Sequence, residues 1–199
     1  MYYLKFFLIP LLLALLPGKP AGNATRWVIS RACSLKVEGS TNVNSFSCII
    51  TNSFRPDTVT LGRSGSSELT SISGGMILNV EDFNCNNPIM TGDLRKTLKA
   101  KEFPQMKVGV LSLSRYPDMR LKTYPLNGLV SIQLAGVTKK FNVVFLVLPS
   151  GTNALMLKGV REIKFSDFNI VPPRKIGGMI QTSDKLMAEF NLALHLLKD

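Results

Sequence analysis

Histidine and cysteine are scarce in this chain, which has one histidine and three cysteines among 199 residues. No CxxC pair and no zinc-ligand spacing is present, so the sequence predicts no metal site and no cofactor. The GxSxG, HExxH, P-loop and dinucleotide-binding motifs are missing as well. His195 is the one candidate base for a cysteine nucleophile. Glu81 and Asp82 are neighbours on a predicted strand, so their side chains point to opposite faces and cannot act on one substrate. We therefore predict that the protein is not an enzyme.

Acidic residues are also in short supply. The chain has 24 Lys and Arg against 13 Asp and Glu, a formal net charge of +11 at pH 7. Its basic residues are not interleaved with stacking aromatic side chains, so we predict no binding to nucleic acid. A basic surface of this kind favours anionic partners. It predicts either peripheral contact with an anionic membrane or an ordinary solvated surface.

A long apolar run occurs only at the N-terminus, where residues 6–16 follow the single charge of Lys5. The run is about half the roughly 20 residues that a membrane-spanning helix needs. Small residues follow it, as at the exit of a secretory signal peptide. We predict a signal peptide over residues 1–24, cleaved near Ala24, and one mature domain over residues 25–199. Removal of the leader would leave a net charge of about +9.

Alternation with a period of two dominates the mature domain and predicts β-strands. It is clearest over residues 186–196, where apolar residues alternate with mostly polar ones. Residues 129–134 and 141–148 alternate too, and the segment 135–139 between them predicts a hairpin. A change of phase between Val110 and Leu111 predicts a β-bulge. Weaker strand patterns cover residues 27–37, 44–50, 76–80, 106–113 and 155–168.

Two segments break the alternation. Residues 53–75 are rich in Ser and Gly and predict a long loop with at most one short strand near residues 58–61. Residues 88–103 place Met90, Leu94 and Leu98 at i, i+4 and i+8, which predicts a short amphipathic helix. In the sequence Thr91 is the candidate N-cap and Pro104 ends the run. We interpret this helix as a plug that closes one end of the sheet rather than as a membrane-inserting segment.

About eight strands separated by short turns predict an all-β fold, an eight-stranded antiparallel barrel with one short amphipathic helix. A closed sheet of this size can hold one ligand. A fully packed core would give the same alternation, so the pattern leaves both possibilities open. An outer-membrane barrel is disfavoured, because residues 186–196 alternate their apolar face with polar side chains such as Glu189 and Asn191.

Three stretches resemble one known family when taken in order. The first leads from a Trp27-bearing strand through the small polar residues 40–48, and the third is the hairpin with Gly128, Leu134, Gly136, Val137, Thr138, Lys139, Phe141 and Val143. The middle stretch contains Val80, Phe83, Cys85, Met90, Asp93, Leu94, Leu98, Lys99, Phe103, Pro104 and Met106. Together they are similar to the YceI-like family, whose members form lipocalin-like antiparallel barrels.

The resemblance implies an exported bacterial protein, periplasmic or secreted, that holds a polyisoprenoid-like apolar lipid inside the barrel without catalysis. The alternative is a packed barrel without a ligand that acts as an interaction or stress-related protein. On the first hypothesis the ligand would contact the inward-facing side chains. These are Phe46, Leu78, Val80, Leu94, Leu98, Val108, Val130, Ile132, Leu134, Phe145, Phe190, Leu192 and Leu194.

An oxidising compartment predicts one disulfide among the three cysteines and one free thiol. Cys48 ends the second predicted strand and Cys85 precedes the helix, so a helix entrance folded back over the sheet would bring them together. We therefore predict a Cys48–Cys85 disulfide. A Cys33–Cys48 bond across the first hairpin, or no disulfide, remain as alternatives. Cys33 is placed in the middle of the first strand, as a small buried or edge thiol.

Overall fold

The computed structural model describes residues 24–51, 57–63 and 69–197. The predicted leader lies outside these ranges except for Ala24, which is the first residue of the first strand. Within these ranges no helix is both long enough and apolar enough to cross a membrane.

The described residues form twelve strands, one α-helix and three short 3₁₀ helices. The strands are β1 Ala24–Ile29, β2 Ser34–Thr41, β3 Ser45–Thr51, β4 Thr58–Arg63, β5 Thr70–Ser73, β6 Met76–Asn79, β7 Gln105–Leu113, β8 Tyr124–Leu134, β9 Val137–Ser150, β10 Ala154–Lys164, β11 Arg174–Lys175 and β12 Ile180–Leu196. The helices are η1 Val80–Asp82, α1 Pro88–Thr97, η2 Ser166–Phe168 and η3 Ile176–Gly178.

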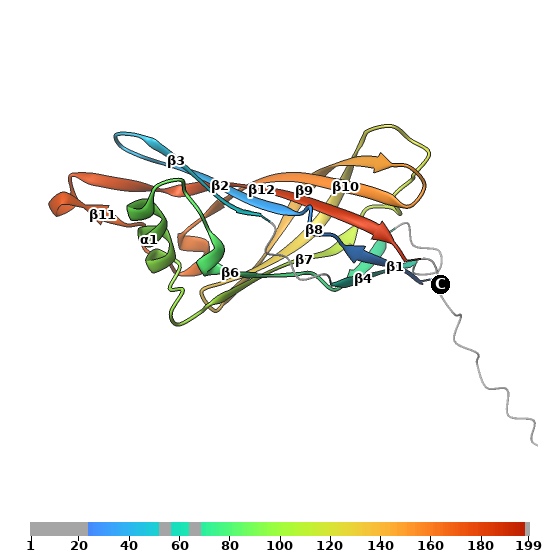
Figure 1. Ribbon diagram of the computed structural model, residues 1–199, viewed down its shortest axis with the longest axis horizontal. Coiled ribbons are helices and arrows are strands. Elements are labelled where there is room, and N and C mark those ends of the chain that lie inside the picture. The colour runs from blue at the N-terminus through green and yellow to red at the C-terminus, as the bar shows by residue number, and fades with distance from the viewer. Residues whose placement is uncertain (1–23, 52–56, 64–68, 198–199) are drawn as a thin grey trace, which may run out of the picture.

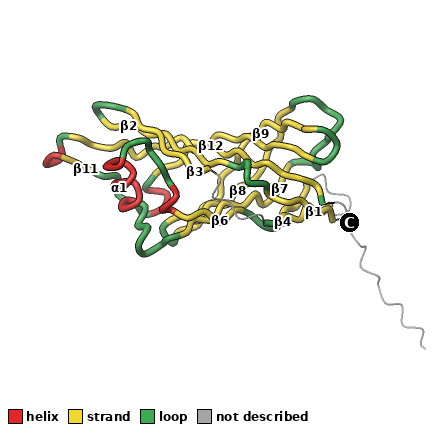
Figure 2. Tube along the Cα trace, in the orientation of Figure 1, coloured by secondary structure: helices red, strands yellow, loops and turns green. Residues whose placement is uncertain are grey.

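Eight of the strands form a closed antiparallel ring in the order β1-β4-β5-β7-β8-β9-β10-β12. The ring closes where β12 returns to β1, with Trp27 opposite Leu196. Strands β2 and β3 extend the barrel along β12, and β6 extends it along β7. The predicted all-β, eight-stranded barrel with one helix is therefore confirmed. Figures 1 and 2 show it as an elongated body with α1 at one end and the C-terminus at the other.

Residues 27–37 form two strands rather than the single one predicted, because a turn at residues 30–33 divides the segment into β1 and β2. Both halves still pair with β12, β1 near its C-terminal end and β2 over residues 182–191. The turn contains an even number of residues, so the buried positions stay odd-numbered on both sides of it. Alternation alone does not reveal a break of this kind.

Residues 58–61 do lie in a strand, β4, but the long loop predicted around it also contains β5. Strand β5 has only four residues, three of them Ser or Thr, and carries little apolar signal. Glu81 and Asp82 lie in η1 rather than on a strand, so our argument from opposite strand faces does not apply to them. The strand predicted to reach residue 168 ends at Lys164.

Helix α1 begins at Pro88 as predicted and ends at Thr97, earlier than the predicted residue 103. Asn87, rather than Thr91, is the N-cap, and its Oδ1 accepts a hydrogen bond from Met90 N at 3.0 Å. Thr91 Oγ1 instead accepts from Cys85 N at 3.0 Å and fixes the chain that enters the helix. The helix ends where Lys99 adopts a φ of +55°.

The predicted bulge is present between Val110 and Ser112 of β7. The predicted hairpin is present too, but its turn has two residues rather than five, since Leu134 pairs with Val137. Ala135 and Gly136 both have positive φ, as a two-residue turn of this type requires.

One side of the ring is not held by backbone hydrogen bonds along its whole length. In the described chain, β9 and β10 pair only from Ser150 and Ala154 to Phe145 and Gly159. Beyond this point Phe168 of η2 is buried between them, with its ring centroid 6.2 Å from that of Phe141. We call residues 137–144 and 160–164 the β9–β10 seam. Side chains rather than main-chain pairs close it.

Candidate functional site

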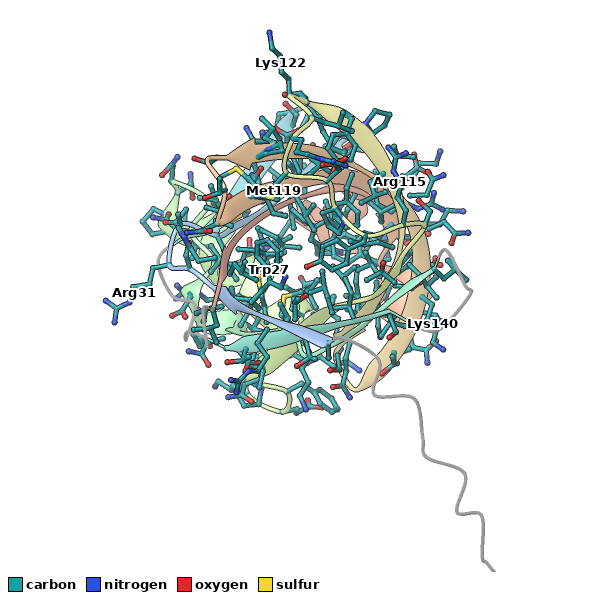
Figure 3. All side chains as sticks on the ribbon, turned by 90° about the vertical axis from the view of Figure 1, so that its right-hand side faces the viewer. Trp27, Arg31, Arg115, Met119, Lys122 and Lys140 are labelled. Carbon is teal, nitrogen blue, oxygen red and sulfur yellow. A yellow bond between two sulfur atoms is a disulfide. The ribbon has the colours of Figure 1, made fainter. Side chains whose placement is uncertain are left out.

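Side chains fill the inside of the barrel. Twelve of the thirteen predicted ligand-contacting residues are buried, and Phe46 is half-buried. The alternation therefore identified the inward faces correctly. Figure 3 looks along the barrel from the end opposite α1 and shows Trp27 inside the ring of strands, with Arg31 and Lys122 outside it.

Two small cavities remain in the interior. A cavity of about 30 Å³ lies beneath α1 and is lined only by apolar side chains, including the predicted residues Leu94, Leu98, Ile132, Leu134 and Phe190. A cavity of about 20 Å³ lies in the other half, and its lining includes the predicted residues Val108, Leu192 and Leu194. An engineered apolar cavity of about 150 Å³ binds a single benzene molecule, so neither of these much smaller cavities holds a lipid chain in this conformation.

Four predicted residues, Leu78, Val80, Val130 and Phe145, are buried but line neither cavity. For all thirteen residues, contact with a ligand stays a prediction. The Phe145 ring occupies the space beside two glycines on the neighbouring strands. A Cβ would lie 2.9 Å from this ring at Gly128 and 2.8 Å from it at Gly159.

A larger cleft, of about 270 Å³, opens at the α1 end of the barrel. It lies between α1, the β2–β3 hairpin and the chain between η2 and β12. Its apolar lining residues are Val43, Phe46, Ile89, Met90, Leu94, Phe165, Pro173 and Ile180. Its polar lining residues are Thr41, Asn44, Asn87, Asp93, Thr97, Lys175 and Thr182.

Of this lining, the sequence-based prediction contained only Phe46 and Leu94. The other residues were missed because most come from a hairpin tip, a helix terminus and an irregular link, where alternation gives no signal. One signal was available: Val43 is a large apolar residue between two polar ones, Asn42 and Asn44.

Leu94 belongs to both spaces, since its side chain lines the cleft and also the inner cavity. It is the one residue common to the two linings. Leu94 on α1 is therefore the point at which the cleft comes next to the apolar interior.

Three kinds of contact hold α1 in place over the interior. The Cys48–Cys85 disulfide, as predicted, joins β3 to the chain before the helix. Arg95 Nη2 donates to Phe83 O at 3.0 Å, and Arg95 also pairs with Glu81. On the cleft side, Lys175 Nζ lies 2.6 Å from Asp93 Oδ1. The helix is thus tied covalently on one side and by a partly exposed ion pair on the other.

The clearest electrostatic perturbations come from surface ion pairs away from the cleft. Hydrogen bonds from Arg120 lower the pKa of Asp118 to about 2. The Glu38 carboxylate, 2.9 Å from Lys36, raises the pKa of the Lys36 ammonium. In the described part of the chain no group of three or more His, Cys, Asp or Glu is placed to hold a metal ion.

Cys33 lies in the turn immediately before β2, so its predicted place in the middle of a strand is wrong. Its prediction as a buried free thiol is confirmed. The sulfur accepts a hydrogen bond from Ala193 N at 3.3 Å and donates to Ala193 O at 3.7 Å. Burial raises the pKa of this thiol.

We expect Cys33 to resist alkylation in the folded protein, because it is buried and because its raised pKa keeps the reactive thiolate scarce. Intact-mass measurement after iodoacetamide treatment at pH 8 should show no adduct on the folded protein and one adduct in denaturant. Reduced, denatured protein should give three adducts. Rapid labelling of the folded protein would contradict the prediction.

No protein-family model matches the chain, and no curated protein sequence matches it. The structure is similar to a polyisoprenoid-binding domain from Saccharophagus degradans implicated in plant cell wall breakdown, with a TM-score of 0.59 and 12% identity over 86% of this chain and 98% of that one. It is also similar to Burkholderia cenocepacia BcnA, with a TM-score of 0.58 and 17% identity over 83% and 98% of the two chains. A Campylobacter jejuni YCEI protein aligns at a TM-score of 0.47 and 15% identity over 71% and 81%. At these identities, the first two matches establish a shared fold.

Proposed function

We propose that this chain, which has the fold of the YceI-like proteins, binds a long apolar lipid such as a polyisoprenoid without catalysing a reaction on it. Three observations support the proposal. The interior is lined by apolar side chains, one protein of the same fold is a polyisoprenoid-binding domain, and a cleft leads from the surface towards that interior.

The strongest support for lipid binding is the position of Leu94, which lines both the cleft and the inner cavity. We infer that an apolar chain lying in the cleft beside Phe46 and Met90 enters the inner cavity where Leu94 lines both spaces, by displacing the Leu94 side chain. It would then contact inner residues such as Ile132 and Phe190. Each buried CH₂ contributes roughly 0.8 kcal/mol, so about ten buried carbons support micromolar binding after the cost of association.

The inner cavity must widen to admit such a chain, because its present volume is about 30 Å³. Two parts of its surroundings can move without breaking main-chain pairs between strands. One is α1, which is held to the barrel by side-chain contacts, the disulfide and flanking turns. The other is the β9–β10 seam. We infer that these two elements adjust when the ligand enters.

We also propose that the protein works outside the cytoplasm, in the periplasm or after secretion. The disulfide supports this location, because disulfides persist in oxidising compartments. The predicted leader supports it as well, from the sequence.

Lipid binding can be tested on purified protein by mass spectrometry of organic extracts and by titration with a fluorescent prenyl probe. We expect a prenyl lipid in the extract or micromolar uptake of the probe. Leu94→Ala removes the barrier between cleft and cavity and should raise probe affinity, whereas Leu94→Trp should lower it at least tenfold. Leu155→Ala is the matched control, because Leu155 is also buried but lines neither the cleft nor the cavities.

The small size of the inner cavities favours a second candidate, a packed barrel that acts through its surface. This candidate predicts no lipid in the extract, no probe uptake and no difference between Leu94 and Leu155 variants. That combination of results would overturn the lipid-binding proposal.

A further inference from the structure

Large apolar side chains are concentrated at the surface of the α1 end of the barrel. The five most exposed in the described chain have between 65 and 83% of their surface accessible. We call them the tip residues: Val43, Ile89, Val171, Ile176 and Met179. Exposed apolar residues elsewhere on the described surface are less accessible and lie on other parts of the barrel.

The tip residues come from three segments that surround the cleft. Val43 lies at the turn of the β2–β3 hairpin, Ile89 in the first turn of α1, and the other three in the link that precedes β12. Hydrogen bonds join the segments. Asn42 Nδ2 of the hairpin donates to Met179 O of the link at 2.9 Å, and Lys175 Nζ of the link donates to Asp93 Oδ1 of α1 at 2.6 Å. Figures 1 and 2 show the β2–β3 hairpin, α1 and β11 together at this end.

Ile176 has a backbone conformation that is unfavourable for a β-branched residue. Its φ is +51°, and Gly177 and Gly178 follow with φ of +61° and +96°. A positive φ is costly for a β-branched residue and is readily adopted by Gly or Asn. The turn therefore holds a large apolar side chain in water at a backbone position where a polar residue would be less strained.

The same end is basic. Residues 88–103 and 164–185 together carry eight Lys or Arg and four Asp or Glu. Of these basic residues, Arg95, Lys175 and Lys185 form ion pairs with carboxylates. Arg174 is exposed and forms no ion pair with any residue of the described ranges. Apolar side chains beside Lys and Arg are the composition of surfaces that lie in the interface of an anionic bilayer.

We propose that this end of the barrel docks on an anionic lipid bilayer, with the tip residues inserted among the headgroups and the basic side chains against the phosphates. A protein partner of comparable stability needs a contiguous, well-packed patch, whereas these side chains stand on separate tips around an open cleft. The inference rests on the proposed function, because docking in this orientation places the cleft mouth against the source of lipid.

Co-sedimentation with vesicles of phosphatidylcholine containing phosphatidylglycerol tests the docking. The wild-type protein should bind these vesicles, bind neutral phosphatidylcholine vesicles more weakly, and lose affinity as salt rises. The double variant Val171→Ser/Ile176→Asn changes two tip residues that do not line the cleft. It should bind at least tenfold more weakly, because two inserted side chains are lost. It should keep its thermal stability, because Asn tolerates the φ of residue 176.

The matched control is Val144→Ser/Val160→Ser, which removes two exposed valines from the barrel wall. Its vesicle binding should equal that of the wild type. Equal losses in both double variants, or no vesicle binding by the wild type, would overturn the proposal. So would tip-dependent self-association without vesicle binding. Prenyl-probe uptake measured without vesicles separates the docking proposal from the lipid-binding proposal. The tip variant should take up the probe as the wild type does, and absence of uptake by the wild type would count against lipid binding itself.

Discussion

Replacing Cys48 and Cys85 with serine should lower the free energy of unfolding by about 4 kcal/mol. The disulfide closes a loop with a sequence separation of 37 residues, and the chain-entropy treatment gives about this value for a loop of this length. The bond acts mainly by restricting the unfolded chain. In the folded protein it joins β3 to the entrance of α1, where an isolated bridge between Ile49 and Asn84 also pairs the main chains.

Urea denaturation of the double variant, compared with the oxidised wild type, measures the loss. Cys33→Ala is the control, because it removes a cysteine and leaves the disulfide intact. Native-state hydrogen exchange should also show faster exchange for the amides of α1 in the double variant. An unchanged unfolding midpoint would contradict this account of the disulfide.

Phe145→Ala should cost about 3–5 kcal/mol, the usual range for truncating a fully buried aromatic side chain. The Phe145 side chain is completely buried. Its ring fills the space left by Gly128 on β8 and Gly159 on β10, so no neighbouring side chain is available to replace it. The substitution should therefore leave a cavity near the middle of the barrel.

A double-mutant cycle with Gly128→Ala tests this packing. Alone, Gly128→Ala should destabilise the protein, because the new Cβ would lie 2.9 Å from a Phe145 ring carbon. In the Phe145→Ala background the same change should cost less, giving a coupling energy of about 1 kcal/mol or more. Thermal or urea unfolding of the four proteins measures it. Additive losses of stability would show that the Phe145 side chain and Gly128 are not energetically coupled.

The fold could be predicted from the sequence because its strands bury one face each, and burial of one face produces a period of two. Strand β12 shows this most clearly, with Leu186, Phe190 and Leu194 inward and Glu189 outward. The same pattern identified the inner residues. The disulfide was predictable because the placements of Cys48 and Cys85 depend only on the order of strand and helix.

The cleft could not be predicted in the same way. Its walls meet through contacts between segments distant in sequence, such as Asp93 with Lys175, and no local pattern encodes such a contact. The size of the interior was also not predictable, because a packed barrel and a hollow one bury the same alternating residues. Only the volumes of the side chains facing one another, as at Phe145 and Gly159, decide between them.

The closure of the ring also bears on how the protein folds. The pairing of Trp27 with Leu196 joins residues from opposite ends of the described chain, and β12 is the shared partner of β1, β2 and β10. These contacts form only after long loops have closed, a topology of high contact order for which folding takes milliseconds to seconds. Until β12 is in place, β1, β2 and β10 expose unpaired edges that can join another molecule. The interval before ring closure is therefore when the chain is most prone to aggregate.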